Sequence, residues 1–79
     1  MRKFISAATL FIMLGPGEKL KKSDIYGESN RIYVTWPVDN IWKVKYRWSG
    51  EWEDITDNDF ASEAEAFNFA YDHFLNTAE

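Results

Sequence analysis

Oxygen-bearing side chains between Asp54 and Glu65 have the spacing of a calcium-binding loop. An EF-hand loop takes ligands from positions 1, 3, 5, 7, 9 and 12 and needs a glycine at position 6 for its sharp turn. Here Asp59 stands at position 6, and the residues before Asp54 are typical of a strand rather than a helix. We therefore expect an acidic strand-to-helix connection without a metal. The candidate ligands are Asp54, Thr56, Asn58, Phe60 through its carbonyl, Ser62 and Glu65.

The sequence contains few of the residues that catalytic sites based on histidine or cysteine require. His73 is the only histidine and there is no cysteine, so a Ser-His-Asp triad or a zinc site would rest on a single ring. The sequence also lacks a glycine-rich phosphate-binding loop. We expect no enzymatic activity, no cofactor and no metal.

The charges are divided unevenly along the chain. All nine Lys and Arg residues lie in positions 1–47 with only four carboxylates, whereas positions 48–79 hold nine carboxylates and no Lys or Arg. The first part therefore carries +5 and the second −9, against −4 for the whole chain. Such asymmetry is typical of a protein that binds a charged partner, of charges matched within the fold, or of both.

The acidic part is the first candidate for a binding surface. Its nine carboxylates carry as much charge as about 15 Å of duplex DNA, so this part of the protein could occupy a groove made for nucleic acid. Phe69, expected on an exposed helix face, would serve as an aromatic anchor. The expected partner is a protein with a basic surface. The expected contact residues are Glu51, Glu53, Asp54, Asp57, Asp59, Glu65, Phe69, Asp72 and His73.

A basic sheet face is the alternative site. Cationic residues with a tyrosine among them are typical of a platform for single-stranded nucleic acid. The net charge of −4 and the neighbouring Glu51, Glu53 and Asp54 argue against this alternative. Nucleic acid is therefore a partner only in this second interpretation. The residues of the expected basic face are Arg31, Tyr33, Lys43, Lys45 and Arg47.

The residues of this face come from two segments, 31–36 and 41–48. Each segment alternates apolar and polar residues, which predicts two strands with one apolar side each. The turn residues from Pro37 to Asn40 predict a hairpin between them. A connection over 37–41 would place Trp36 opposite Trp42, so that the apolar sides coincide. The residues expected on the shared apolar side are Ile32, Val34, Trp36, Trp42, Val44, Tyr46 and Trp48.

A third strand is expected over Glu51–Thr56, after a turn at Ser49-Gly50. A two-residue turn would set Arg47 opposite Trp52, and a three-residue turn would set Arg47 opposite Glu53. The basic strand lies beside the acidic one in either register, so part of the charge asymmetry is expected to be matched internally. The register itself is left open.

The last segment predicts an amphipathic helix from Ser62 to about Asn76. Ser62 and Glu65 form a capping-box pattern, in which the hydroxyl and the carboxylate satisfy free backbone amides. The helical period assigns Ala64, Phe67, Ala70, Tyr71, Phe74 and Leu75 to the face on the sheet, and Glu65, Phe69, Asp72, His73 and Asn76 to the outward face.

The apolar run Phe4–Leu14 has no clear period and could be a strand, a helix or the core of a signal peptide over residues 1–17. We expect a strand buried on both faces, and hence a cytoplasmic protein; a signal peptide would instead make it secreted or periplasmic. The run is shorter than the ~20 residues of a membrane-spanning helix. A loop is expected over 18–30, with a helical turn at Lys19–Ser23.

These elements predict one α+β domain over residues 1–79: a small antiparallel sheet of three to four strands covered on one face by a C-terminal helix. In size, acidity, aromatic content and lack of cysteine, the chain resembles the small phage-encoded proteins that inhibit host enzymes or defence complexes. That resemblance of type implies a viral inhibitor that acts by binding a protein. The oligomeric state is left open, with a dimer as one option.

Overall fold

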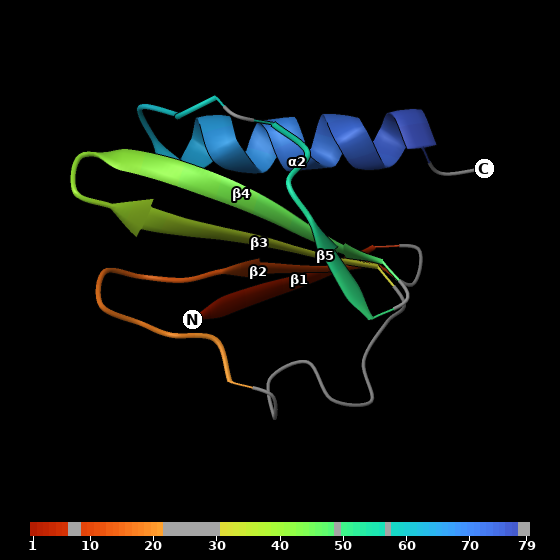
Figure 1. The fold of residues 1–79 in the computed structure, drawn as a ribbon, viewed down its shortest axis with the longest axis horizontal. Helices are drawn as coiled ribbons and strands as arrows, with labels where there is room; N and C mark the ends of the chain where they lie inside the picture. Colours follow the sequence, from red (N-terminus) through yellow and green to blue (C-terminus); the bar gives the residue numbers. More distant parts are fainter. Residues whose placement is uncertain (7–8, 22–30, 49, 57, 78–79) are drawn as a thin grey trace.

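The computed structural model describes residues 1–6, 9–21, 31–48, 50–56 and 58–77. It shows an α+β fold in which one C-terminal helix packs on a five-stranded sheet in the order β1-β2-β3-β4-β5 (Figure 1). Neighbouring strands are antiparallel except β2 and β3, which are parallel. The predicted class is confirmed, but the sheet has five strands and is mixed. The elements are β1 Arg2–Ser6, β2 Thr9–Met13, β3 Arg31–Val38, β4 Ile41–Trp48, β5 Glu51–Glu53 and α2 Glu63–Thr77.

The N-terminal apolar run forms two strands, so the prediction of one strand over Phe4–Leu14 is wrong. β1 and β2 pair antiparallel from Arg2 opposite Met13 to Ser6 opposite Thr9, and residues 7–8 lie outside the described part. The split gives the two halves different environments: β1 is an exposed edge strand, whereas residues 9–12 of β2 are buried on both faces. The absence of a clear period in the sequence reflects this two-sided burial.

The parallel pairing of β2 with β3 requires the intervening chain to cross one face of the sheet. The described part of this connection, residues 14–21, lies on the side opposite α2 (Figure 1). There Leu20 and Trp36 pack on a cluster of Leu10, Ile12, Leu14, Ile32 and Val34. Residues 19–21 are not helical, and the rest of the helical turn predicted at Lys19–Ser23 lies outside the described residues. The sheet therefore has a core on each face.

The hairpin of β3 and β4 has a different register from the predicted one. Val38 pairs with Ile41 across a two-residue turn, Asp39-Asn40, in which Asp39 adopts a φ of 55°. A left-handed first turn residue is typical of tight hairpins, and the turn allows Pro37 to remain in β3. Each β3 residue consequently pairs one position away from the expected partner, and Trp36 lies opposite Lys43. Ile32, Val34 and Trp36 thus face away from α2, contrary to prediction.

The Ser62 cap of α2 is as predicted, whereas the Glu65 carboxylate bonds the amide of the residue before Ser62 and not that of Ser62 itself. The Ser62 hydroxyl accepts a hydrogen bond from the Glu65 amide at 3.2 Å, and the Glu65 carboxylate accepts one from the Ala61 amide at 2.9 Å. The helical face is rotated from the predicted one, because Ala66 is buried together with Ala70 and Phe74, whereas Ala64 and Leu75 are exposed. Small side chains at 66 and 70 leave room for the large rings of the sheet beneath them. The buried cluster on this side comprises Phe11, Tyr33, Val44, Tyr46, Ala66, Ala70 and Phe74.

The third predicted strand is shorter than expected, and its register is the one that follows from a two-residue turn. β5 covers only Glu51–Glu53, with Arg47 opposite Trp52. Residue 49 lies outside the described part, and Gly50 has a φ of 87°, which favours glycine. After β5 the chain returns to the start of β4, where Phe60 and Trp42 exchange backbone hydrogen bonds of 2.8 and 3.0 Å. No helix in the described part is long and apolar enough to cross a bilayer.

Candidate binding surfaces

The residues predicted to form the acidic contact surface are spread over the molecule. Glu51 and Glu53 lie on β5, opposite Trp48 and Tyr46, which places both carboxylates on the α2 side of the sheet. Asp59 lies at the other end of β4, beside the Phe60 bridge. Asp54, Glu65 and Asp72 are exposed, and Asp57 lies outside the described residues.

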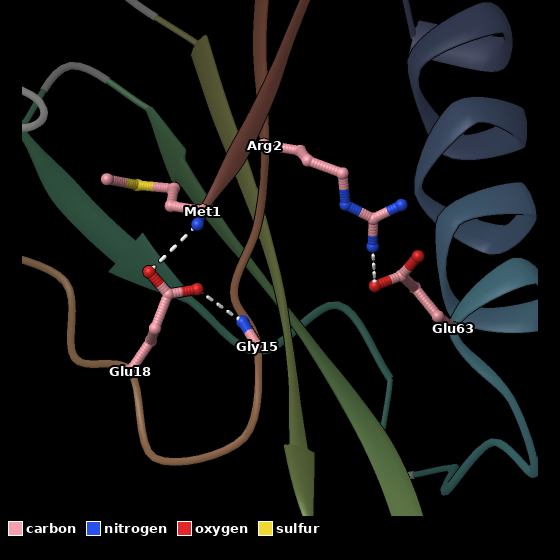
Figure 2. A network of polar contacts seen from close by, with 5 residues as sticks. All are labelled: Met1, Arg2, Gly15, Glu18 and Glu63. Carbon is pink, nitrogen blue, oxygen red and sulfur yellow. Dashed lines mark hydrogen bonds and ion pairs between the residues drawn. The ribbon is translucent and has the colours of Figure 1, made fainter.

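Several carboxylates have structural partners. Asp59 pairs with Lys43 at 3.0 Å, and Glu63 pairs with Arg2 of β1 (Figure 2). Both pairs join the basic part of the sequence to the acidic part, so some of the charge asymmetry is matched within the fold. Glu65, the last candidate calcium ligand, uses its carboxylate in the helix cap.

Glu18 holds the start of the β2–β3 connection in place. Its carboxylate accepts hydrogen bonds from the Met1 amino group at 2.8 Å and from the Gly15 amide at 2.6 Å (Figure 2). The bond from the Met1 amino group and, to a smaller extent, the bond from the Gly15 amide lower the pKa of Glu18.

Phe69 is not the freely exposed anchor that the sequence predicted. Its ring is half-buried, with its centroid 5.4 Å from that of Phe60. Phe69 is half-buried because the backbone bridge between Phe60 and Trp42 holds the segment before α2 beside the helix, where the Phe60 ring contacts that of Phe69. No local helix-cap pattern predicts this contact, because Phe60 lies two residues before Ser62 and Phe69 seven residues after it, outside the pair of positions that a hydrophobic staple joins.

His73 is half-buried against the sheet, so the prediction that it lies on the outward helix face is wrong. Its Nδ1 lies 2.6 Å from the Tyr33 hydroxyl, and its ring lies 5.1 Å from that of Tyr46. Burial, followed by the nearby Arg31 guanidinium, lowers the pKa of His73 below its ordinary value of 6.5. Burial also raises the pKa values of Tyr33 and Tyr46.

This environment predicts a loss of stability in mild acid. With a depressed pKa in the folded state, the unfolded chain takes up a proton at His73 first, so stability falls as the pH drops through about 6.5 and levels off below the folded-state pKa. Urea unfolding from about pH 8 to pH 5 should show this fall. His73→Gln, which keeps a hydrogen-bonding side chain, should remove that part of the pH dependence; an unchanged profile would contradict the prediction.

The predicted basic face is divided between the two sides of the sheet. Tyr33 is only 1% exposed, beneath α2. Arg31 is on the same side, where it donates a hydrogen bond to the Thr77 carbonyl at 3.2 Å and lies 4.9 Å from the Trp48 ring. Lys43, Lys45 and Arg47 point to the other side. Arg31 and Tyr33 therefore cannot share a surface with them, because the one-residue shift in the hairpin register moves β3 side chains to the opposite face.

The same shift places two tryptophans beside the basic residues. Trp36 lies opposite Lys43, Trp52 lies opposite Arg47, and Lys45 comes between these two pairs along β4. The Arg47 guanidinium lies 5.9 Å from the Trp52 ring. We call this side, which faces away from α2, the basic aromatic face; it comprises Trp36, Lys43, Lys45, Arg47 and Trp52. Trp36 and Trp52 were missed as site residues. The signal for Trp36 was a two-residue turn at positions 39 and 40, and the signal for Trp52 was the two-residue turn at positions 49 and 50.

A hollow of about 310 Å³ lies on the basic aromatic face. We call it the tryptophan hollow. A second hollow of about 210 Å³ adjoins it and shares Trp36 and Lys45. The second one is more polar, because Lys43, Asp54, Thr56 and Asn58 contribute to its wall. The tryptophan hollow is lined by Leu14, Glu18, Lys19, Leu20, Val34, Trp36, Lys45 and Trp52.

Comparisons with protein-family models, with curated proteins and with solved structures found no match to this chain.

Proposed function

We propose that the protein is a non-enzymatic binding module for single-stranded nucleic acid and that the basic aromatic face is its binding surface. The observation that carries this proposal is the alignment of three cationic side chains on one side of β4 between two tryptophans. Cations that follow the phosphates and aromatic rings that stack on bases are the two components of a sequence-tolerant single-strand site.

The spacing of the cations suits an extended chain. Lys43, Lys45 and Arg47 are alternate residues of one strand, so their Cα atoms follow each other at roughly 6.5–7 Å. Lys45 has no ion pair within the described part of the chain, and Arg47 contacts Trp52. Lys45 and Arg47 can therefore pair with phosphates without first losing a carboxylate partner. Lys43 is already paired with Asp59, so a phosphate would compete with this carboxylate for the lysine.

The acidic net charge is less of an obstacle on this side of the sheet than the sequence suggested. Glu51 and Glu53 lie beside the basic residues in sequence, but they point to the α2 side. Of the three carboxylates that argued against nucleic acid, only Asp54 lines one of the two hollows. Because screening limits electrostatic effects to roughly 8–10 Å at ordinary salt, the charges near the face matter more than the sum over the chain.

Binding of a basic protein, as by a phage-type inhibitor, is the second candidate function. It is favoured by Glu51 and Glu53, which are exposed on an edge strand and have no ion pair within the described residues. The dispersed positions of the other predicted carboxylates and the half-buried Phe69 support it less.

Fluorescence anisotropy with labelled single-stranded DNA and RNA at about 50 mM salt tests the proposal. We expect the parent to bind, binding to weaken as salt is raised, and the triple variant Lys43→Ala, Lys45→Ala, Arg47→Ala to lose most of its affinity because the phosphates lose their counter-charges. Circular dichroism should confirm that the variant is folded.

The matched comparison is Glu51→Lys with Glu53→Lys, which changes charges on the opposite side of the same hairpin. Under the proposal this variant loses none of its affinity for oligonucleotides, because only negative charges are removed. A parent that ignores oligonucleotides but binds a lysine-rich peptide, with binding lost in Glu51→Lys/Glu53→Lys, would replace the proposal by the second candidate.

A further inference from the structure

The tryptophan hollow has the size and lining of a site for one small planar group. Its volume of about 310 Å³ lies at the lower end of the range of about 300–1,000 Å³ for ligand pockets. Leu14 and Val34 form a buried apolar wall within the second core cluster, and Leu20 from the β2–β3 connection forms another. The walls therefore come from both the sheet and the crossing segment.

Two indole rings stand on either side of a single cation. Lys45 is opposite Val34, so Trp36 is its diagonal neighbour on β3, and Trp52, opposite Arg47, is its diagonal neighbour on β5. Diagonal neighbours in a sheet are within reach of long and aromatic side chains. Trp36 is half-buried on the core, whereas Trp52 is 40% exposed and has the Arg47 guanidinium near its ring. Trp36 is thus the fixed wall and Trp52 the accessible stacking surface.

Charge at the hollow is placed for an anion attached to the planar group. Lys19 and Lys45 line it, whereas the Glu18 carboxylate accepts hydrogen bonds from Met1 and Gly15 and so has its charge partly compensated. An apolar ligand would leave Lys19 and Lys45 without a role. A nucleotide uses both features, because its base is flat and its phosphate is anionic.

We propose that the tryptophan hollow receives one unstacked base of a bound single strand, stacked on Trp52, with the adjoining phosphates at Lys19 and Lys45. This assignment rests on the proposed function and adds to it a fixed point along the strand. The remaining cations of β4 would follow the backbone on the polar side of Trp36, where the second hollow lies.

The chain supplies a matched control for the key tryptophan. Trp48 and Trp52 belong to the same hairpin, are 44% and 40% exposed, and each lies near an arginine, but they point to opposite sides of the sheet. In anisotropy titrations with octathymidylate, Trp52→Ala should weaken binding about 10- to 100-fold, the range for the loss of one stacked base. Trp48→Ala should leave the affinity within about twofold, and thermal melting should show both variants folded. Equal losses in the two variants would overturn the proposal.

An octamer of abasic deoxyribose phosphates separates base insertion from phosphate binding. It keeps the charges and removes every base, so the parent should bind it at least about 10-fold more weakly than octathymidylate, and Trp52→Ala should cause no further loss. If the parent binds both strands equally well, the base site is wrong while nucleic-acid binding stands. If it binds neither, the proposed function fails as well. Displacement of octathymidylate by an equal concentration of an acidic, aromatic peptide would assign the hollow to a protein ligand and overturn the base site.

Discussion

Phe11→Ala is expected to cost about 3–5 kcal/mol of the free energy of unfolding, the largest loss among the variants considered. Phe11 is 1% exposed in the middle of β2, and its ring is stacked on Tyr33 with the centroids 5.0 Å apart. It also meets Phe74 of α2 edge-on at 5.6 Å. Truncation would leave a cavity between the sheet and the helix. A chain of this length has a total stability of roughly 4–12 kcal/mol, so the variant would be close to unfolding.

Urea unfolding followed by circular dichroism is the appropriate measurement for Phe11→Ala. Phe4→Ala is the matched control, because Phe4 lies directly opposite Phe11 on β1 but is 42% exposed. The control should lose much less stability. A loss for Phe11→Ala no larger than that for Phe4→Ala would mean that the aromatic cluster beneath α2 is wrongly placed.

Thr35→Val is expected to stabilise the protein by about 1–3 kcal/mol. Thr35 is buried on the α2 side of β3, and its hydroxyl has no hydrogen-bond partner in the described part of the chain. A buried hydroxyl without a partner costs roughly this amount, because it has left water and gained no bond. Valine has nearly the same shape, favours strands and carries no polar atom at this position.

The same urea experiment measures Thr35→Val. Thr56→Val is its counterpart, because the Thr56 hydroxyl accepts a hydrogen bond from the Asn58 amide at 3.0 Å at the surface. The counterpart should be neutral or destabilising. If Thr35→Val lowers the midpoint, the hydroxyl has a partner in the folded protein that the described residues do not contain.

Local signals in the sequence predicted the elements better than their faces. The helix and its cap follow from Ser62 and Glu65, whose interactions need only neighbouring residues. The direction of β3 side chains could not be predicted from alternation alone, because β3 has a core on each of its faces. Neither Tyr33 nor Val34 is accessible, so apolar and polar alternation does not reveal which side α2 covers.

The prediction of the candidate site depended on which side each strand residue faces, so it was wrong where the predicted face was wrong. Lys43, Lys45 and Arg47 were correctly placed on one side of a strand, because β4 does have one open face. The aromatic neighbours of these residues were not predicted. Trp36 was expected in the core beneath the helix, and the position of Trp52 was left open because the register of the third strand was left open. The crossing segment that forms a wall of the tryptophan hollow has no periodic pattern, so no sequence signal predicted its position.

The single parallel pairing in the sheet has a consequence for the order in which the fold can form. From β3 to β5, each strand pairs with the next across a two-residue turn, and these contacts close with little loss of chain entropy. The ladder between β2 and β3 forms only after residues 14–30 have closed a loop, which makes it the most non-local pairing of the sheet. Assembly is therefore expected to start in the C-terminal part, with the β1–β2 hairpin docking afterwards. Because Leu14 and Leu20 are brought into place by that docking, the tryptophan hollow is completed only in the last stage of folding.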